Sequence, residues 1–382
     1  MEYDVIIAGG GVAGIAAALA AKRSGAKRVL LLERQYLLGG LATCGLVTIY
    51  LPLCDGQGRQ VSFAIAEELL RLSVCHGAEG RYPDAWLGQG TLEQRQAQRY
   101  LVQFNPYAFA IDAEQLLQKE GVQVFYGAMI SGVNAAQGRL QSIEIVTKSG
   151  RETLTANAFV DATGDADLFW LAGAPTAEHA KGNILASWYY GTQQGEYDLH
   201  PLGFCDMLDE TPGAQHTGET RYHGLDAREL SAMTVQAHRT LYADFLASGD
   251  IQRGHALTAV ASIPQVRMTR RLAGIATPDE RNPYAHEETS VGMYADWRKR
   301  GAAYELPFGA LCSAALQNVF AAGRCISVTD AMWDITRVIP VCAVSGQAAG
   351  TAAALCPINH APELYAVQAE LNRQQVALHF DA

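Results

Sequence analysis

The apolar positions at the start of the chain predict alternating strands and helices. Short runs of branched apolar residues at 5–8 and 29–32 are typical of strands that are buried on both faces. Between them, residues 12–24 are rich in alanine, which favours a helix, and Gly25 provides its end. The order strand, helix, strand predicts a parallel α/β unit.

Similar patterns continue along the rest of the chain. Helical spacing of apolar residues or an alanine-rich interior predicts helices at 62–72, 105–118, 228–248 and from Pro340 onward. Glycine turns at Gly138 and Gly150 separate runs that predict an antiparallel meander at 128–133, 140–147 and 153–156. Buried strands are predicted at 158–161 and 319–322, and a loop is predicted at 327–337.

The turn between the first strand and the first helix carries the motif G-x-G-x-x-G at Gly9, Gly11 and Gly14. Gly9 permits the tight turn, Gly11 lets a pyrophosphate approach the backbone, and Gly14 lets the helix pack close to the strand. Glu33 ends the second strand 19 residues after Gly14, where an acid accepts ribose hydroxyls. The context predicts dinucleotide binding, because a glycine turn that binds no ligand would not explain an acidic residue at the end of the second strand.

Composition excludes several classes of function. The chain of 382 residues has a net charge of −10, which argues against nucleic acid as a partner because phosphate binding needs a basic surface. Its 8 cysteines are scattered without C-x-x-C pairs or Cys/His clusters, so neither a zinc site nor a disulfide framework is indicated. The apolar stretch 6–21 contains the glycine turn and lacks a basic leader, so we expect no membrane span and a cytoplasmic protein.

A second glycine pair, Gly39-Gly40, follows the second strand. Together with the first motif, the segment Ala162-Thr163-Gly164 after a buried strand, and the strand ending at Gly323 before a small-residue helix, it resembles the FAD-binding fingerprint of the two-dinucleotide-binding-domain flavoproteins. In detail the chain is most similar to the FAD-dependent oxidoreductase family sometimes called xanthan-lyase-like. The resemblance implies FAD as the cofactor.

The resemblance also implies a fold and a set of cofactor-binding residues. The expected fold is α/β, with a Rossmann-like FAD-binding domain (a parallel sheet with helices and a small antiparallel meander) and an inserted α+β substrate lobe. The FAD-binding domain is expected at 1–50, 105–173 and 312–360, the substrate or cap lobe at 51–104 and 174–311, and a C-terminal helix at 361–382. The expected cofactor-binding residues are Gly9, Gly11, Val12, Ala13, Gly14, Glu33, Arg34, Gly39, Gly40, Leu41, Ala42, Thr43, Ala162, Thr163, Gly164, Gly323, Arg324, Val338, Ile339 and Val341.

Two positions near the expected flavin site differ from the family pattern or have more than one interpretation. Many relatives carry an acid directly after the glycine at position 323, whereas this chain has Arg324, so the ribityl contact is expected from a backbone N–H. Cys44 follows the glycine pair and has three interpretations: a packing residue, a redox thiol or a covalent flavin attachment point. Packing is favoured, because the nearest cysteine is Cys54.

Charged residues elsewhere provide candidates for catalysis. Arg337 is the first candidate to hold an anionic or oxygen-rich substrate or the flavin C2 carbonyl. Asp334, with Asp330, is a candidate proton acceptor, although a loop aspartate is more often a helix cap. The arginines at 267, 270 and 271 either hold an anionic substrate or bind carboxylates between the lobes, and such interlobe ion pairs are the commoner outcome. Asp165 and Asp167 are either helix caps or cofactor ligands, and the interpretation as caps is favoured.

The predicted function is hydride transfer between a small molecule and N5 of FAD, with catalytic candidates Cys44, Arg337 and Asp334. One alternative is a non-redox protein in which FAD is structural, sensory or used for a redox-neutral isomerisation. Another is an NAD(P)H-dependent reductase, although only one G-x-G-x-x-G motif is evident. The expected partner is a small-molecule substrate, and homo-oligomerisation is left open.

Overall fold

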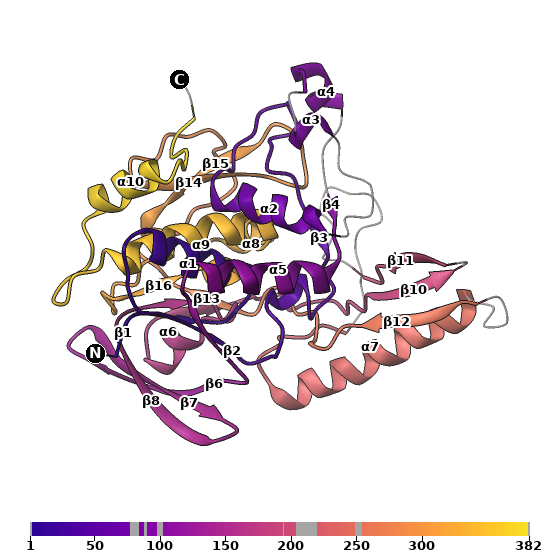
Figure 1. The fold of residues 1–382 in the computed structure, drawn as a ribbon, viewed down its shortest axis with the longest axis horizontal. Coiled ribbons are helices and arrows are strands. Elements are labelled where there is room, and N and C mark those ends of the chain that lie inside the picture. Colours follow the sequence, from indigo (N-terminus) through magenta and orange to yellow (C-terminus); the bar gives the residue numbers. More distant parts are fainter. Residues whose placement is uncertain are drawn as a thin grey trace. The chain divides into compact units, whose positions relative to one another are not determined.

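The computed structural model describes residues 2–76, 84–87, 90–97, 102–193, 195–203, 220–248 and 254–380 (Figure 1). It divides into two compact units. Unit 1 contains Met1–Gly40, Thr48–Ala177 and Arg270–Ala382, and unit 2 contains Leu41–Val47 and Glu178–Thr269.

Unit 1 is built on a seven-stranded sheet with the order β5-β2-β1-β8-β7-β6, in which β16 also pairs with β8. The parallel part consists of β1 (Tyr3–Ala8), β2 (Val29–Glu33), β5 (Gln123–Tyr126), β16 (Val319–Ala321) and the second half of β8 (Gly150–Asp161). The antiparallel part consists of β6 (Met129–Ala136), β7 (Arg139–Thr147) and the first half of β8. This mixed α/β sheet confirms the predicted fold class.

Strand β8 replaces the two strands that the sequence predicts at 153–156 and 158–161. Its first four residues are exposed and lie in the half that pairs with β7, whereas its last four residues are all buried between β1 and β16. The prediction of two strands is wrong because one continuous strand serves both the solvent-facing meander and the buried parallel sheet.

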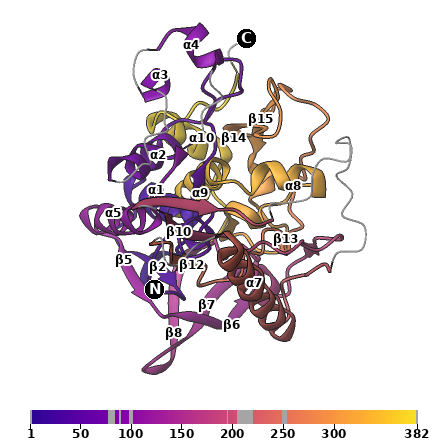
Figure 2. The same ribbon diagram turned by 90° about the vertical axis from the view of Figure 1, so that its right-hand side faces the viewer.

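Two helices of small residues lie against each other in unit 1. They are α1 (Val12–Arg23) and α9 (Ile339–Ala354), and most of their residues are buried. An added Cβ on Gly346 would lie 2.2 Å from the carbonyl oxygen of Ala13, and one on Gly350 would lie 2.1 Å from that of Ala17. The backbones therefore touch directly, and both views show the two helices side by side (Figures 1 and 2).

The remaining elements of unit 1 surround this centre. Further helices are α2 (Ile65–Cys75), α3 (Asp84–Leu87), α4 (Leu92–Ala97), α5 (Pro106–Lys119), α6 (Asp167–Leu171), α8 (Asp330–Thr336) and α10 (Leu364–Arg373). Three two-stranded sheets pair β3 (Ile49–Tyr50) with β4 (Val102–Gln103), β9 (Thr176–Glu178) with β13 (Arg270–Leu272), and β14 (Ser290–Ala295) with β15 (Ala303–Pro307).

Local signals explain where two of these helices begin. Asn105 accepts hydrogen bonds from the N–H groups of Tyr107 and Ala108, so α5 starts at Pro106 as predicted. The predicted loop at 327–337 is wrong, because α8 occupies most of it. Thr329 caps α8 by accepting a hydrogen bond from the N–H of Met332 at 3.3 Å.

Unit 2 combines a three-stranded sheet with the long helix α7 (Ala227–Ser248). The sheet has the order β11 (Glu196–His200), β10 (Tyr189–Gln193), β12 (Ala256–Val260). Tyr189 packs against Leu241 and Phe245 of α7, so the predicted helix at 228–248 is confirmed with its apolar face on the sheet (Figure 2).

The two compact units group some segments differently from the expected functional domains. Residues 51–104 and 270–311, which were expected in the cap lobe, belong to unit 1, and residues 41–47 belong to unit 2. The functional assignment of these segments stays a prediction. Within the described part of the chain, every helix is too short or too polar to traverse a lipid bilayer.

The contact between α1 and α9 generates a stability prediction. Gly350→Ala places a methyl group against the carbonyl of Ala17, and such overpacking costs about 1–3 kcal/mol, more than the ~1 kcal/mol that alanine gains over glycine in a helix. We expect a melting temperature lowered by a few degrees in thermal unfolding.

The matched control is Gly132→Ala in β6, where an added Cβ would make an ordinary contact of 3.7 Å with Glu144. We expect a change within about 1 kcal/mol there. Equal melting temperatures for the wild type and the Gly350 variant would contradict close helix packing.

Candidate dinucleotide-binding site

The glycine turn after β1 has two glycines that packing requires and one that borders open space. An added Cβ on Gly9, whose φ is 103°, would lie 2.5 Å from the carbonyl oxygen of Ala162, and one on Gly14 would lie 1.8 Å from that of Gly9. At Gly11, by contrast, no atom of the described residues lies within 4 Å of the Cβ position. The turn therefore leaves room beside Gly11, directly before the first turn of α1.

The pair Gly39-Gly40 lies against this turn. The N–H of Gly39 donates to the carbonyl oxygen of Gly10 at 2.8 Å. Gly40 has a φ of 56°, and its Cβ position is 3.3 Å from the Cα of Gly11. Two sequence motifs that are separated by β2 thus meet at one point of unit 1.

Glu33 is buried at the end of β2 and binds the same turn. Its Oε2 accepts a hydrogen bond from the N–H of Gly10 at 2.8 Å, and its Oε1 accepts one from Gln35 at 2.7 Å. Burial raises the pKa of Glu33, while these N–H groups and the charge of Arg34 act in the opposite direction. Because each carboxylate oxygen has two lone pairs, the side chain keeps capacity for a further donor.

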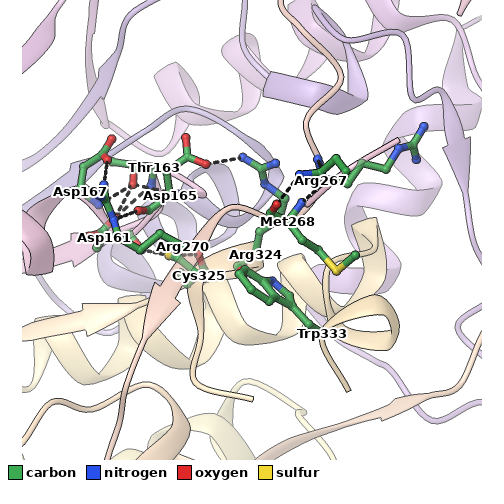
Figure 3. Close-up of polar contacts among 12 residues, drawn as sticks. Asp161, Thr163, Asp165, Asp167, Arg267, Met268, Arg270, Arg324, Cys325 and Trp333 are labelled. Carbon is green, nitrogen blue, oxygen red and sulfur yellow. Dashed lines mark hydrogen bonds and ion pairs between the residues drawn. The ribbon is translucent and has the colours of Figure 1, made fainter. Parts of the chain in front are cut away.

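Asp161 organises the segment after β8. It is fully buried, and it accepts hydrogen bonds from the hydroxyl of Thr163 at 2.7 Å and from the N–H of Leu168 at 2.8 Å (Figure 3). Burial raises the pKa of Asp161 to about 7, and the charge of Asp167 adds to the rise. The sequence predicts Asp161 only as the end of a buried strand, although an acid at the end of an apolar run is itself a signal of a functional or capping role.

The interpretation of Asp165 and Asp167 as helix caps is wrong. Asp161 supplies the bonds to the first turn of α6, so the other two acids are available for arginines. Asp165 pairs with Arg324 at 3.3 Å, and Asp167 pairs with Arg270 at 2.8 Å (Figure 3). The segment is thereby tied to two later parts of unit 1.

The arginines at 267, 270 and 271 have aromatic or acidic neighbours. Besides its ion pair, Arg270 lies 4.6 Å from the ring centre of Trp170, and Arg271 pairs with Asp330 at 3.0 Å and lies 4.6 Å from Trp333. These two arginines therefore have carboxylate partners, and both partners of each pair belong to unit 1. In unit 2, Arg267 lies 5.0 Å from the ring centre of Trp188.

Gly323 brings the starts of α1 and α9 together. Its φ is 76°, and an added Cβ would lie 2.8 Å from the Cβ of Ala13 and 3.6 Å from the Sγ of Cys342. The N–H of Gly323 donates to the Oγ of Ser345 at 3.0 Å. The positive ends of two helix dipoles therefore converge at the carboxyl ends of β1, β8 and β16.

No side chain among the described residues caps either of these helix starts. Gly11 is the N-cap residue of α1, and Val338 is that of α9, where a proline occupies one of the first two helical positions. The first N–H groups of a helix have no partner within the helix, so each start offers donors to a ligand. The N–H groups of Val12 and Ala13 are among the donors at the start of α1, and those of Ile339 and Val341 are among the donors at the start of α9.

Arg324 occupies the position where relatives were expected to carry an acid. Its Nη2 lies within 2.5 Å of the Cβ position on Gly164, so this glycine makes room for the guanidinium group. The carbonyl oxygen of Arg324 accepts a hydrogen bond from the indole of Trp333 at 2.5 Å. The expected backbone contact from Arg324 to a ribityl chain stays a prediction.

The catalytic candidates Arg337 and Asp334 are bound to each other. Nε of Arg337 donates to Oδ1 of Asp334 at 2.9 Å, and Arg298 lies 3.7 Å from the other carboxylate oxygen. The guanidinium group of Arg337 lies 6.0 Å from the ring centre of Trp297. Only Val338 separates Arg337 from the first residue of α9.

The candidates Leu41, Ala42, Thr43 and Cys44 belong to unit 2. Cys44 is a buried free thiol, and its carbonyl oxygen accepts a hydrogen bond from the N–H of Ser262 at 2.8 Å. The packing, redox and covalent interpretations of Cys44 stay predictions.

The donors and the space in unit 1 fit FAD. A pyrophosphate needs N–H donors, a positive helix end and a glycine without a side chain, and the start of α1 offers all three. An adenosine ribose needs a carboxylate at the end of the second strand, where Glu33 lies. The edge of the sheet thus has the architecture of a dinucleotide-binding flavoprotein.

The comparison with known families identifies the class more closely. A family model described as FAD dependent oxidoreductase matches residues 4–193 and 280–371. The chain belongs to this family, and it is an FAD-dependent oxidoreductase with FAD as its cofactor. The narrower xanthan-lyase-like assignment stays a prediction. A search of curated proteins found no match.

Solved structures give distant similarities. A geranylgeranyl bacteriochlorophyll reductase-like protein from Thermoplasma acidophilum is 13% identical, with a TM-score of 0.47 and coverage of 98% of this chain and 82% of that chain. The p-nitrophenol 4-monooxygenase PnpA from Pseudomonas putida DLL-E4 is 12% identical, with a TM-score of 0.46 and coverage of 97% and 84%. THI4 of Thermovibrio ammonificans is 21% identical with a TM-score of 0.33; the match covers 46% of this chain and 63% of that one.

The different surroundings of Gly11 and Gly14 generate a paired prediction. Gly11→Ala keeps an allowed backbone (φ −66°, ψ 178°) and meets no described atom, so the melting temperature of the apoprotein stays unchanged. Its methyl group occupies the space that a pyrophosphate needs, so FAD affinity falls about tenfold or more, which is about 1.4 kcal/mol.

Gly14→Ala has the opposite signature, because its methyl group collides with the carbonyl of Gly9 and destabilises the apoprotein itself. Fluorescence titration of FAD and thermal unfolding of both apoproteins separate the two effects. Unchanged FAD affinity in the Gly11 variant would exclude this turn as the pyrophosphate site.

Proposed function

We propose that this FAD-dependent oxidoreductase transfers a hydride between a small-molecule substrate and N5 of FAD. The observation that supports the proposal is the convergence of the α1 and α9 starts at Gly323. When bound, FAD supplies the electron-pair chemistry at N5, and the chain supplies binding, orientation and electrostatics.

The start of α1 would bind the pyrophosphate, and Glu33 would accept the ribose hydroxyls of the adenosine. The positive end of α9 would face the pyrimidine part of the flavin, where it stabilises negative charge and so favours the reduced cofactor. Ile339 and Val341, in the first turn of α9, would present N–H groups to this part of the ring.

Arg337 is the proposed anchor for an anionic or oxygen-rich substrate. Asp334 holds the guanidinium group in one orientation, which reduces the entropy lost when a substrate binds. Asp334 could accept a proton only if its hydrogen bond with Arg337 were broken. We therefore propose that Asp334 acts first as a positioning residue for Arg337.

Anaerobic mixing with candidate donors tests the proposed reaction. Sugars, hydroxy acids, amines and NAD(P)H are added to the FAD-bound protein, and the visible flavin band is followed. Bleaching by a small organic donor, followed by reoxidation in turnover, is the expected result. Bleaching by NAD(P)H would favour a reductase, and a ligand-binding protein whose flavin never turns over would favour the non-redox alternative.

The role of Arg337 makes a separate prediction. Arg337→Ala raises the KM for the substrate about tenfold or more, because hydrogen bonds to a charged group contribute about 1.5–3 kcal/mol, while the FAD content stays at the wild-type level. Arg373→Ala is the control, since that side chain is 62% exposed and pairs with Glu370. Loss of FAD in the Arg337 variant would assign Arg337 to the cofactor instead.

The covalent interpretation of Cys44 has a direct test. Burial and the free thiol are compatible with packing, so we expect acid precipitation of the protein to release all of the flavin into the supernatant. Flavin that stays in the pellet of the wild type but not of Cys44→Ser would establish a covalent bond.

A further inference from the structure

A cluster of three metal-ligating side chains lies in unit 1, outside the residues assigned to FAD. We infer that His286, Glu305 and His379 form a binding site for one Zn²⁺ ion. One ligand atom from each of them lies within 4.8 Å of the other two. The three residues come from separate parts of the sequence, so folding alone brings them together.

Glu305 is the central group of this cluster. It lies on β15 opposite Met293 of β14, and its side chain is only 2% exposed. A buried carboxylate needs compensation by hydrogen bonds or a cation. Both imidazoles approach this carboxylate, with His379 Nδ1 at 2.8 Å and His286 Nδ1 at 3.8 Å from Oε2.

Backbone bonds fix both histidines relative to the carboxylate. The N–H of Glu287, directly after His286, donates to Oε2 of Glu305 at 2.8 Å. The N–H of Phe380, directly after His379, donates to Oε1 at 3.0 Å. Each histidine is therefore held next to Glu305 by the residue that follows it, and such positioning of ligands by their neighbours is typical of metal sites.

The segment that carries His379 is anchored on both sides. The hydroxyl of Ser290 donates to the carbonyl oxygen of Leu378 at 2.5 Å. The ring of Phe380 packs on that of Tyr284 with the centroids 4.8 Å apart. The position of His379 therefore does not depend on the contact with Glu305 alone.

The donor set and its geometry suit Zn²⁺. Two imidazoles and one carboxylate are ligands of zinc sites that keep a fourth position for water. With bonds of about 2.0–2.2 Å, tetrahedral ligand atoms lie about 3.3 Å apart. The observed separations of 2.8 and 3.8 Å bracket this value. Solvent reaches the cluster, because His286 is 65% exposed and His379 is 36% exposed.

The test uses the full-length, untagged, FAD-bound protein after treatment with a chelator. Isothermal titration with zinc chloride is expected to give one tight site per chain and a higher melting temperature in the presence of Zn²⁺. His286→Ala and His379→Ala are each expected to lower the affinity at least about tenfold and to abolish the thermal shift. His360→Ala, another exposed histidine, is the matched control and is expected to leave both values unchanged.

Two results would contradict a zinc site at this cluster. A wild type that binds no Zn²⁺ at one equivalent, or variants of both histidines with wild-type affinity, would overturn the inference and leave the cluster as a hydrogen-bonded anchor for the C-terminal segment. Glu305→Gln provides a further test if it folds, and His286→Ala, whose side chain is largely exposed, serves if it does not.

Discussion

The close contact between the backbones of α1 and α9 determines the arrangement of the rest of unit 1. Gly346 and Gly350 carry no side chain where α9 meets the carbonyl oxygens of Ala13 and Ala17. The two helices therefore start at the same edge of the sheet. A larger residue at either glycine would separate the helices and, with them, the two positive dipole ends that the cofactor is proposed to use.

Buried acids hold the loops around this edge, and backbone N–H groups provide most of their partners. Glu33 binds the turn that contains Gly10, and Asp161 binds the first turn of α6. A hydrogen bond from a backbone N–H to a carboxylate stabilises the negative charge and also fixes the position of the loop that carries the N–H group. Asp165 and Asp167 pair with arginines of later segments.

The sequence predicts the parts of this site that depend on local chemistry. The glycines of the first turn, Glu33 and the alanine-rich interior of α9 follow from rules on backbone freedom and helix packing, and the structure brings the first motif, Gly39-Gly40 and Gly323 together within unit 1. Helix starts that depend on how whole elements pack do not follow from local sequence patterns. Asp161 binds the first turn of α6 because β8 ends beside that helix. Thr329 begins α8 because the apolar residues of α8 are buried in the core. Neither helix start can be predicted from a short window of sequence.

Hydrogen exchange of the apoprotein and the FAD-bound protein tests the central claim most directly. The uncapped N–H groups at the starts of α1 and α9 have no intrahelical partners, so their exchange is fast until a ligand covers them. The account predicts that FAD slows exchange in peptides covering residues 9–16 and 338–343. Slowing that is confined to other parts of the chain, with these two segments unchanged, would contradict the proposed site.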